Sequence, residues 1–283
     1  MLHIYNISYK TVNHYELGTK GAIWQFLVLP ETNSTQNIQS AKFSNSENET
    51  VEQSINGYGF STYKIQSKKL ISEISFSGTF VLTKQQVNPI KELVTSNSKE
   101  TFECLQRLDF KTDFEPFLRE TPLTYLPDDN RDYFTLNESI SIFQNLQQLN
   151  EKVFKTIHFK TNITNVNTSV SDVLKIKAGV CQDFTHLFCA VARKNGIPSR
   201  YISGYLHQGK GYFGDSQMHA WAEAYIPHMG WVGFDPTNNI LADHNHIKVC
   251  HGKDYNDCSP LKGIVFSSGT NDTKYQVSVH SDQ

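Results

Sequence analysis

The stretch "AGVCQDFTHLFCAV", residues 178–191, decides the fold, because it places a cysteine two residues after a glycine and then continues as an amphipathic helix. A stripe of apolar side chains follows Cys181 at helical spacing: Phe184, Leu187, Phe188, Val191 and Ala192. Asn195 and Gly196 end this pattern, and Pro198 prevents its continuation. We therefore expect a core-facing helix that begins at Cys181.

The hydrophobic period changes from helical to alternating after this helix. Strands are predicted for three segments: "SRYISGYLH" (199–207), "HAWAEAYI" (219–226) and "WVGFDPT" (231–237). Before the cysteine we expect a helix over 138–157 with Asn137 as its N-cap and a shorter one within 168–179, where Ser169 and Asp172 have the spacing of a capping box. Helices followed by an antiparallel sheet make an α+β core.

The N-terminal part of the chain is predicted to be rich in strands. "LHIYNISYK" (2–10) alternates apolar and polar residues, and "AIWQFLVLP" (22–30) is an apolar run that ends at Pro30. We expect a β-sandwich-like domain or a curled sheet of short strands here. The predicted domains are a β-rich domain (1–85), a helical and irregular connection (86–135), the α+β core (136–265) and a C-terminal strand segment (266–283).

The composition is that of a soluble globular protein without a strong charge bias. A formal charge of −2 and a pI near 6.6 argue against nucleic-acid binding and give no polybasic membrane signal. The N-terminus lacks the features of a signal peptide, and no apolar run approaches the ~20 residues of a membrane span. Five scattered cysteines fit no disulfide framework, so we expect reduced thiols in the cytoplasm. The oligomeric state is left open.

Cys181 is either a small buried apolar residue or a nucleophile. Free cysteines are among the most buried residues, which favours the first interpretation. Its position favours the second, because the exposed N–H groups of a helix's first turn stabilise a thiolate. The N–H of Cys181 could also form part of an oxyanion hole. Cys189 has apolar neighbours and is expected in the core.

A thiolate nucleophile needs a base and a group that orients the base. His219 begins one predicted strand, and Asp235 ends the next one. Taken singly, His219 could be an interior histidine and Asp235 a turn residue before a proline. Together with Cys181 they fit a triad in which the thiol attacks, His219 takes its proton and Asp235 stabilises the imidazolium.

The predicted hairpin gives this triad a geometrical condition. A plain four-residue loop over "PHMG" would pair Ile226 with Trp231, and His219 and Asp235 would then point to opposite faces of the sheet. The triad therefore predicts a loop with an odd number of residues or a one-residue bulge between the two strands.

Other residues of the chain compete for functional roles. His186 lies on the helix of Cys181, but five positions away it points elsewhere, so we expect a packing role. Asp183 is expected to interact with the helix dipole, and Gln182 is either an oxyanion donor or a polar residue at a helix end. A zinc site is conceivable in one cluster, which lacks a Cys-x-x-Cys or His-x-x-x-His pair: Asp243, His244, His246, Cys250, His251 and Cys258. We expect no metal and no cofactor.

Several segments resemble the bacterial transglutaminase-like superfamily, whose members are often described as cysteine proteases. The resemblance is carried by "GVCQDFTHL", "GIPSRYISGYL", "MHAWAEAYIPHMGWVGFDPTNN" and "HGKDYNDCSPLKGIV" over residues 135–265, and more loosely by the N-terminal segment "INGYGFSTYKIQSKKL". The chain departs from the family in two places. It lacks an aromatic residue shortly after Phe159, and it has Lys253 where the family usually has arginine.

The resemblance implies a papain-like core in which Cys181 is the nucleophile, His219 the base and Asp235 the orienting carboxylate. It also implies that the 243–258 cluster is a family segment rather than a metal site. We expect a thiol enzyme that acts on a protein or peptide substrate, with hydrolysis favoured over transfer to an amine acceptor. A binding or scaffold protein that keeps the fold without turnover is the alternative. The glycine-rich loop 207–217 is either a cleft wall or a hairpin tip.

Overall fold

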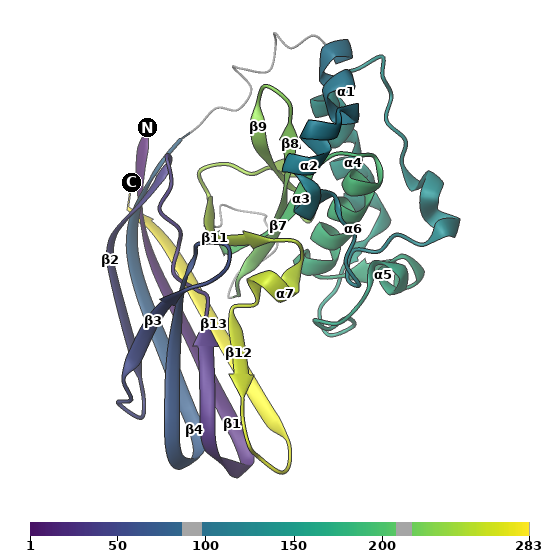
Figure 1. Ribbon diagram of the computed structural model, residues 1–283. Coiled ribbons are helices and arrows are strands. Elements are labelled where there is room, and N and C mark those ends of the chain that lie inside the picture. Colours follow the sequence, from purple (N-terminus) through teal and green to yellow (C-terminus); the bar gives the residue numbers. More distant parts are fainter. Residues whose placement is uncertain (87–97, 208–216, 283) are drawn as a thin grey trace.

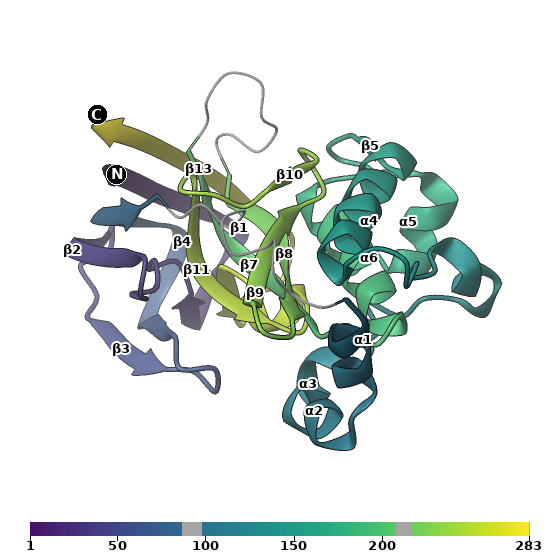
Figure 2. The same cartoon turned by 90° about the horizontal axis from the view of Figure 1, so that it is seen from above.

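Three layers make up the computed structural model, which describes residues 1–86, 98–207 and 217–282. A long curled sheet lies on one side, a five-stranded sheet lies in the middle, and helices cover the other side (Figures 1 and 2). Two clusters of buried apolar side chains join these layers, one between the two sheets and one between the middle sheet and the helices. The middle sheet is therefore buried on both faces, and the predicted α+β class is confirmed.

The long sheet contains both ends of the chain. Its six strands are β1 (Leu2–Phe26), β2 (Gln36–Asn45), β3 (Val51–Ile55), β4 (Ser61–Gln85), β12 (Leu261–Ile264) and β13 (Asn271–Asp282). Alternate residues of β1 are buried, as its period-two sequence predicts. The expectation of short strands was wrong for β1 and β4, which run for 25 residues each. They continue through register shifts near Gly18 and Gly21, two glycines with positive φ.

The C-terminal segment returns to the start of the chain. Strand β13 pairs antiparallel with β1, with Val277 opposite Tyr9 and Tyr275 opposite Thr11. The first and last strands consequently lie side by side, and both termini are at the same end of the long sheet (Figure 1). The domain boundaries given above remain a prediction.

The middle sheet is antiparallel and has the strand order β10-β9-β8-β7-β11. Its strands are β7 (Ser199–Leu206), β8 (His219–Ile226), β9 (Gly230–Asp235), β10 (Ile240–Leu241) and β11 (His246–Gly252). The sequence predicted β7, β8 and β9, and β11 joins them at the edge beside β7. A parallel pair of two-residue strands, β5 (His158–Phe159) and β6 (Ala178–Gly179), precedes the cysteine.

The helices pack on the far face of the middle sheet. They are α1 (Ser98–Gln106), α2 (Leu108–Asp113), α3 (Glu115–Leu118), a 3-10 turn (Asp128–Tyr133), α4 (Ile142–Thr156), α5 (Val170–Ile176) and α6 (Cys181–Lys194). The short α7 (Tyr255–Cys258) instead contacts β11 and β7, and its Cys258 is buried in the cluster between the two sheets. Helix α6 is buried almost throughout its length and contacts β8 and β7. Ser169 caps α5, as predicted.

The predicted N-cap of the long helix was wrong. Helix α4 begins at Ile142, and Ser141 caps it in a capping box with Gln144. Asn137 lies outside the helix because the side chain of Asn145 binds both its backbone N–H and its C=O, at 2.7 and 3.0 Å. Its apolar face buries Ile142, Leu146, Leu149 and Val153, whereas Phe154 is 40% exposed.

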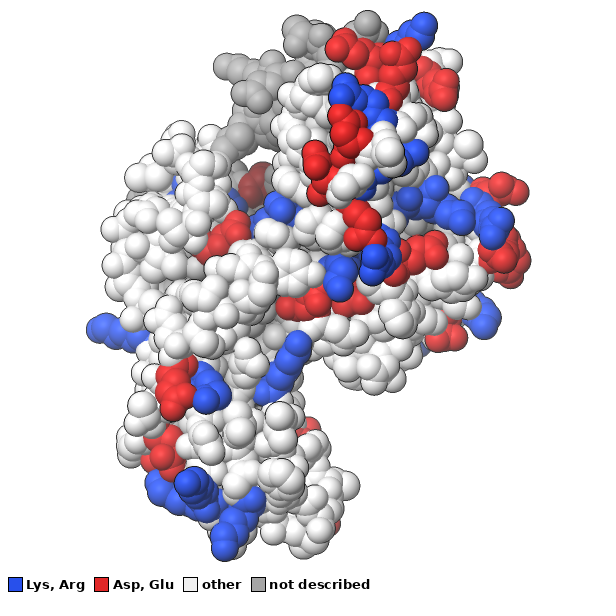
Figure 3. All heavy atoms as spheres, viewed as in Figure 1, with Lys and Arg blue, Asp and Glu red and all other residues white. Residues whose placement is uncertain are grey.

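Charged side chains of both signs are interspersed on the face shown in Figure 3. Lysines and arginines lie next to aspartates and glutamates, and no patch of one sign covers this face among the described residues. No helix of the described residues is both long and apolar enough to cross a membrane.

Candidate active site

Cys181 is the first residue of α6, and a hydrogen-bonded turn holds the start of this helix. The carboxylate of Asp183 accepts hydrogen bonds from the N–H of Val180 and the hydroxyl of Thr164, both at 2.7 Å. A Cβ on Gly179 would collide with this carboxylate, which explains why glycine precedes the cysteine. Burial raises the pKa of Asp183 above its usual value. Asp183 therefore caps the helix, and Cys181 itself is half-buried.

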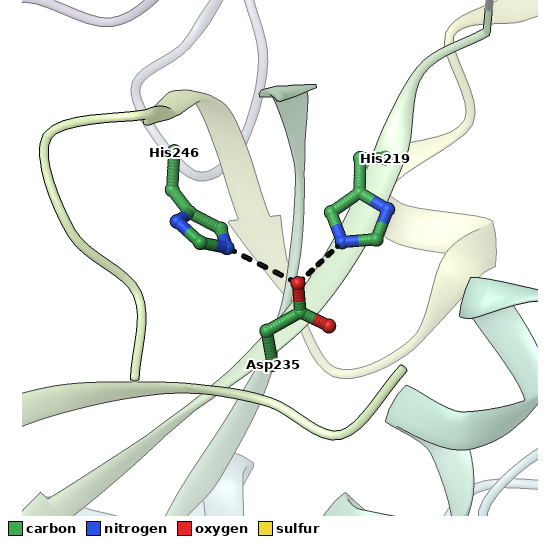
Figure 4. Close-up of side chains that lie close together, drawn as sticks. All are labelled: His219, Asp235 and His246. Carbon is green, nitrogen blue, oxygen red and sulfur yellow. Dashed lines mark hydrogen bonds and ion pairs between the residues drawn. The ribbon is translucent and has the colours of Figure 1, made fainter. Parts of the chain in front are cut away.

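His219 begins β8, where its imidazole is buried between Asp235 and Cys181. Its Nε2 donates to Oδ2 of Asp235 at 2.8 Å (Figure 4). Its Nδ1 has no hydrogen bond of ordinary geometry to a described residue, but Cys181 is close enough to interact with the ring. Burial opposes the charged imidazole, yet Asp235 and then Cys181 outweigh it and raise the pKa of His219 to about 10.

The β8–β9 hairpin satisfies the geometrical condition that the triad imposes. Ile226 pairs with Gly230, and the pairing stays regular up to Ala222 opposite Phe234. The loop therefore has three residues, 227–229, which is the predicted odd number. Because side chains alternate along a strand, this register directs His219 and Asp235 to the same face.

Asp235 is a fully buried carboxylate that accepts five hydrogen bonds. Oδ2 accepts from His219, from Nε2 of His246 at 3.1 Å and from the Asn238 side chain at 2.8 Å. Oδ1 accepts from the backbone N–H groups of Thr237 and Asn238 at 3.0 and 3.3 Å. Burial alone would raise the pKa of Asp235, but the two histidines lower it well below its usual value. The group is ionised at any physiological pH.

His246 is a residue of this site that the sequence did not reveal. It begins β11 and reaches the same oxygen of Asp235 as His219 does (Figure 4). Its Nδ1 lies 3.1 Å from the backbone nitrogen of Asp243 and 3.2 Å from Oδ1 of the same residue. Because the carboxylate of Asp235 can only accept, Nε2 carries the proton given to it. From the sequence, His246 was grouped with residues of a possible metal cluster. No local pattern showed that β11 would bring it to Asp235 on β9, because the two strands are not adjacent in the sheet.

The structure divides that cluster into separate groups. Asp243 lies 3.2 Å from His246 and 3.7 Å from His244. Cys250 and Cys258 are buried near each other, and His251 contacts the Arg200 side chain. His244 stacks on His3. Among the described residues, one group could offer three metal ligands within 4.8 Å of one another: His219, Asp235 and His246. Both histidines of this group give a hydrogen bond to Oδ2 of Asp235.

The two other candidates on α6 have structural partners. His186 is buried, and its Nε2 accepts from the N–H of Tyr255 at 3.1 Å. Burial, with Arg193 nearby, lowers the pKa of His186 to about 3, so this histidine stays neutral and supports packing. The side chain of Gln182 donates to the carbonyl of Val166 at 3.4 Å.

A cleft of about 330 Å³ opens beside Cys181 and His219. Core elements form one wall, while Tyr9 of β1 and Tyr275 of β13 extend the lining into the long sheet. A second cavity of about 410 Å³ is lined by His246 together with several charged side chains. The loop 207–217 falls almost entirely outside the described residues.

Comparisons with known proteins identify the core. Residues 132–236 match the transglutaminase-like superfamily. The fold of the whole chain is similar to that of a protein from Cytophaga hutchinsonii that is proposed to be a cysteine protease, with a TM-score of 0.80, 20% identity and coverage of 99% of this chain and 91% of that one. The core is thus transglutaminase-like, and the predicted resemblance is confirmed.

Two curated relatives are similar to part of the chain. An uncharacterized protein of Mycobacterium tuberculosis is 37% identical over 135 residues, which are 44% of this chain and 43% of that protein. A protein-glutamine gamma-glutamyltransferase of Pseudomonas aeruginosa is 29% identical over 104 residues, which are 35% of this chain and 15% of that enzyme. The chain spans less than half the length of each of these relatives.

We expect His246 to stabilise the fold through Asp235. His246→Ala removes a hydrogen bond to a buried charge and leaves a cavity, so the free energy of unfolding should fall by about 2–4 kcal/mol. His246→Gln keeps an N–H donor and should recover more than half of this loss. His244→Ala is the control and should cost less than about 1 kcal/mol. Urea unfolding measures all three, and equal losses for His246→Ala and His244→Ala would contradict the assignment.

The raised pKa of His219 predicts a pH dependence of stability. Because this pKa lies above the unfolded value of 6.5, the contribution of the charged imidazole is complete below pH 6.5 and is lost as the pH rises through about 10. The difference in unfolding free energy between wild type and His219→Gln should shrink from pH 6 to pH 10 by more than about 1.4 kcal/mol, the equivalent of one pKa unit. A constant difference in urea titrations at both pH values would refute it.

Proposed function

We propose that this transglutaminase-like core is a thiol enzyme acting on peptide or amide bonds, with Cys181 as nucleophile, His219 as general base and Asp235 as the orienting carboxylate. The main support is the buried His219, which donates from Nε2 to Asp235 and interacts with Cys181 on its other side. A histidine held in this way presents Nδ1 to the sulfur, which is the arrangement that proton transfer from a thiol requires.

The proposed reaction proceeds through a thioester. The thiol proton resides on Nδ1 of His219, and the Cys181 sulfur attacks the carbonyl carbon of the substrate. The negative oxygen of the tetrahedral intermediate is placed to accept from the N–H of Cys181, since the first N–H groups of a helix have no partner within it. The C–N bond then breaks, and the leaving nitrogen takes the proton from His219.

The second half of the reaction restores the enzyme. Water gives a proton to Nδ1 of His219 and attacks the thioester carbonyl, and the C–S bond breaks to release the acid. Asp235 stabilises the imidazolium in both halves, and its depressed pKa keeps it from taking the proton itself. An amine in place of water would give acyl transfer, the reaction class in the name of the Pseudomonas relative.

Cys181 should react with iodoacetamide near neutral pH much faster than Cys189. The imidazolium of His219 stabilises the thiolate of Cys181, whereas burial raises the pKa of Cys189, which lies on the same helix. Labelling rates at pH 6.5 are measured by peptide mass spectrometry in wild type, His219→Ala and Asp235→Asn. Both variants should slow the labelling of Cys181 by at least about tenfold, because each weakens the positive charge that faces the sulfur. Equal rates at the two cysteines, unchanged in the variants, would refute the proposal.

Hydrolysis should exceed transfer when both outcomes are possible. Among the described residues that line the cleft there is no Asp or Glu to attract a protonated amine. Wild type is incubated with casein and a biotin-linked pentylamine, with Cys181→Ala as the control. We expect new peptide ends to outnumber biotin incorporated into casein, both depending on Cys181. More incorporation than cleavage would assign the protein to acyl transfer instead.

A further inference from the structure

The long sheet supplies part of the cleft beside Cys181. Tyr9 of β1 and Tyr275 of β13 line this cleft together with Cys181 and His219. Tyr275 lies opposite Thr11, two residues from Tyr9, so the two tyrosines share one face of the sheet. A segment bound at Cys181 would therefore extend onto the long sheet.

The hydroxyl of Tyr9 is buried and has no hydrogen-bond partner among the described residues. Its side chain is fully buried, and its oxygen is one of few buried side-chain atoms left without a partner. Buried tyrosine hydroxyls normally have one. Burial, with Tyr275 and Tyr255 nearby, raises the pKa of Tyr9 well above its usual value, so the hydroxyl keeps its proton and acts as a donor.

The described lining of the cleft carries no lysine, arginine, aspartate or glutamate. Apart from the histidine of the proposed triad, its polar groups are amides and hydroxyls, among them Asn162, Thr164 and Asn165, and its larger apolar groups are tyrosines and Met218. A charged side chain would lose its hydration here without gaining an opposite charge. The lining consequently favours an uncharged segment.

We propose that Tyr9 is a substrate-binding residue, whose hydroxyl donates a hydrogen bond to an amide carbonyl of an uncharged peptide segment that lies across the cleft next to the reacting bond. This inference rests on the proposed function and specifies its substrate. The tyrosine binds the part of the peptide that flanks the bond attacked by Cys181.

The test compares two reagents for Cys181 that differ in how much of the cleft they occupy. Iodoacetamide needs only the thiolate, whereas a peptidyl chloromethyl ketone must bind across the cleft first. Three such ketones are used, blocked at the N-terminus, with the sequences Phe-Ala, Phe-Lys and Phe-Asp. Their rates with Cys181 are divided by their rates with glutathione. In wild type the Phe-Ala reagent should react at least tenfold faster than either charged reagent.

Tyr9→Phe removes the hydroxyl and keeps the ring. The rate with the Phe-Ala reagent should fall about fivefold, the effect of one neutral hydrogen bond, and the rate with iodoacetamide should not change. The melting temperature should stay the same or rise, because the hydroxyl has no hydrogen-bond partner to lose among the described residues. Tyr15→Phe is the matched control on the same strand. It breaks the 2.7 Å bond from Nε1 of Trp24 and should lower the melting temperature while leaving both rates unchanged.

Three outcomes would overturn the inference. If Tyr9→Phe lowers the melting temperature and leaves the Phe-Ala rate unchanged, Tyr9 is a structural residue. If neutral and charged reagents react equally, the cleft does not select uncharged segments. If iodoacetamide itself labels Cys181 no faster than Cys189, the proposed function fails, and this inference falls with it for that separate reason.

Discussion

The buried negative charge of Asp235 constrains the rest of the site. Moving a carboxylate out of water costs several kcal/mol unless hydrogen bonds replace its hydration. Here the replacement comes from three directions: His219 on β8, His246 on β11, and the turn at Thr237 and Asn238. Each of these elements must keep its place relative to the others, because a shift of any of them would remove at least one hydrogen bond from the buried charge. The same contacts fix the ring that faces Cys181.

The long sheet contributes to this constraint through β11, an edge strand of the middle sheet. The side-chain amide of Gln36 accepts from the backbone N–H of Lys248 at 3.1 Å and donates to its carbonyl at 2.8 Å. The pairing of β11 with β7 shifts register just after Lys248. Gln36 therefore provides hydrogen bonds to backbone groups of β11 where the regular strand pairing is interrupted. On the neighbouring strand the hydroxyl of Tyr205 donates to the carbonyl of Val28 at 2.6 Å. The layer that carries His246 is therefore held by the N-terminal strands.

The sequence predicted those features of the fold and the site that depend on short-range periodicity. The start of α6 at Cys181 follows from a helical stripe, and the common face of His219 and Asp235 follows from strand alternation once the loop length is odd. His246 could not be found in this way, because β11 reaches Asp235 across β7 and β8. Such a contact depends on the strand order of the sheet, which no local pattern specifies. The N-cap of α4 was also predicted wrongly. Asn137 does not cap the helix, because its backbone N–H binds the side chain of Asn145, and a contact between residues eight positions apart is not part of the capping pattern.

The two cavities differ in the charged side chains that line them. The cavity lined by His246 also contains a largely buried ion cluster, in which Glu223 binds Arg200 and Lys248. Burial would raise the pKa of Glu223, but the two cations lower it to about 2, so these charges neutralise one another locally. The described lining of the cleft at Cys181 has none of these groups. The ionisable group that faces the thiol is the imidazole of His219, which Asp235 holds by a hydrogen bond of 2.8 Å. In the proposed triad two residues, His219 and Asp235, act on the Cys181 sulfur, and no lysine, arginine, aspartate or glutamate of the described cleft lining takes part.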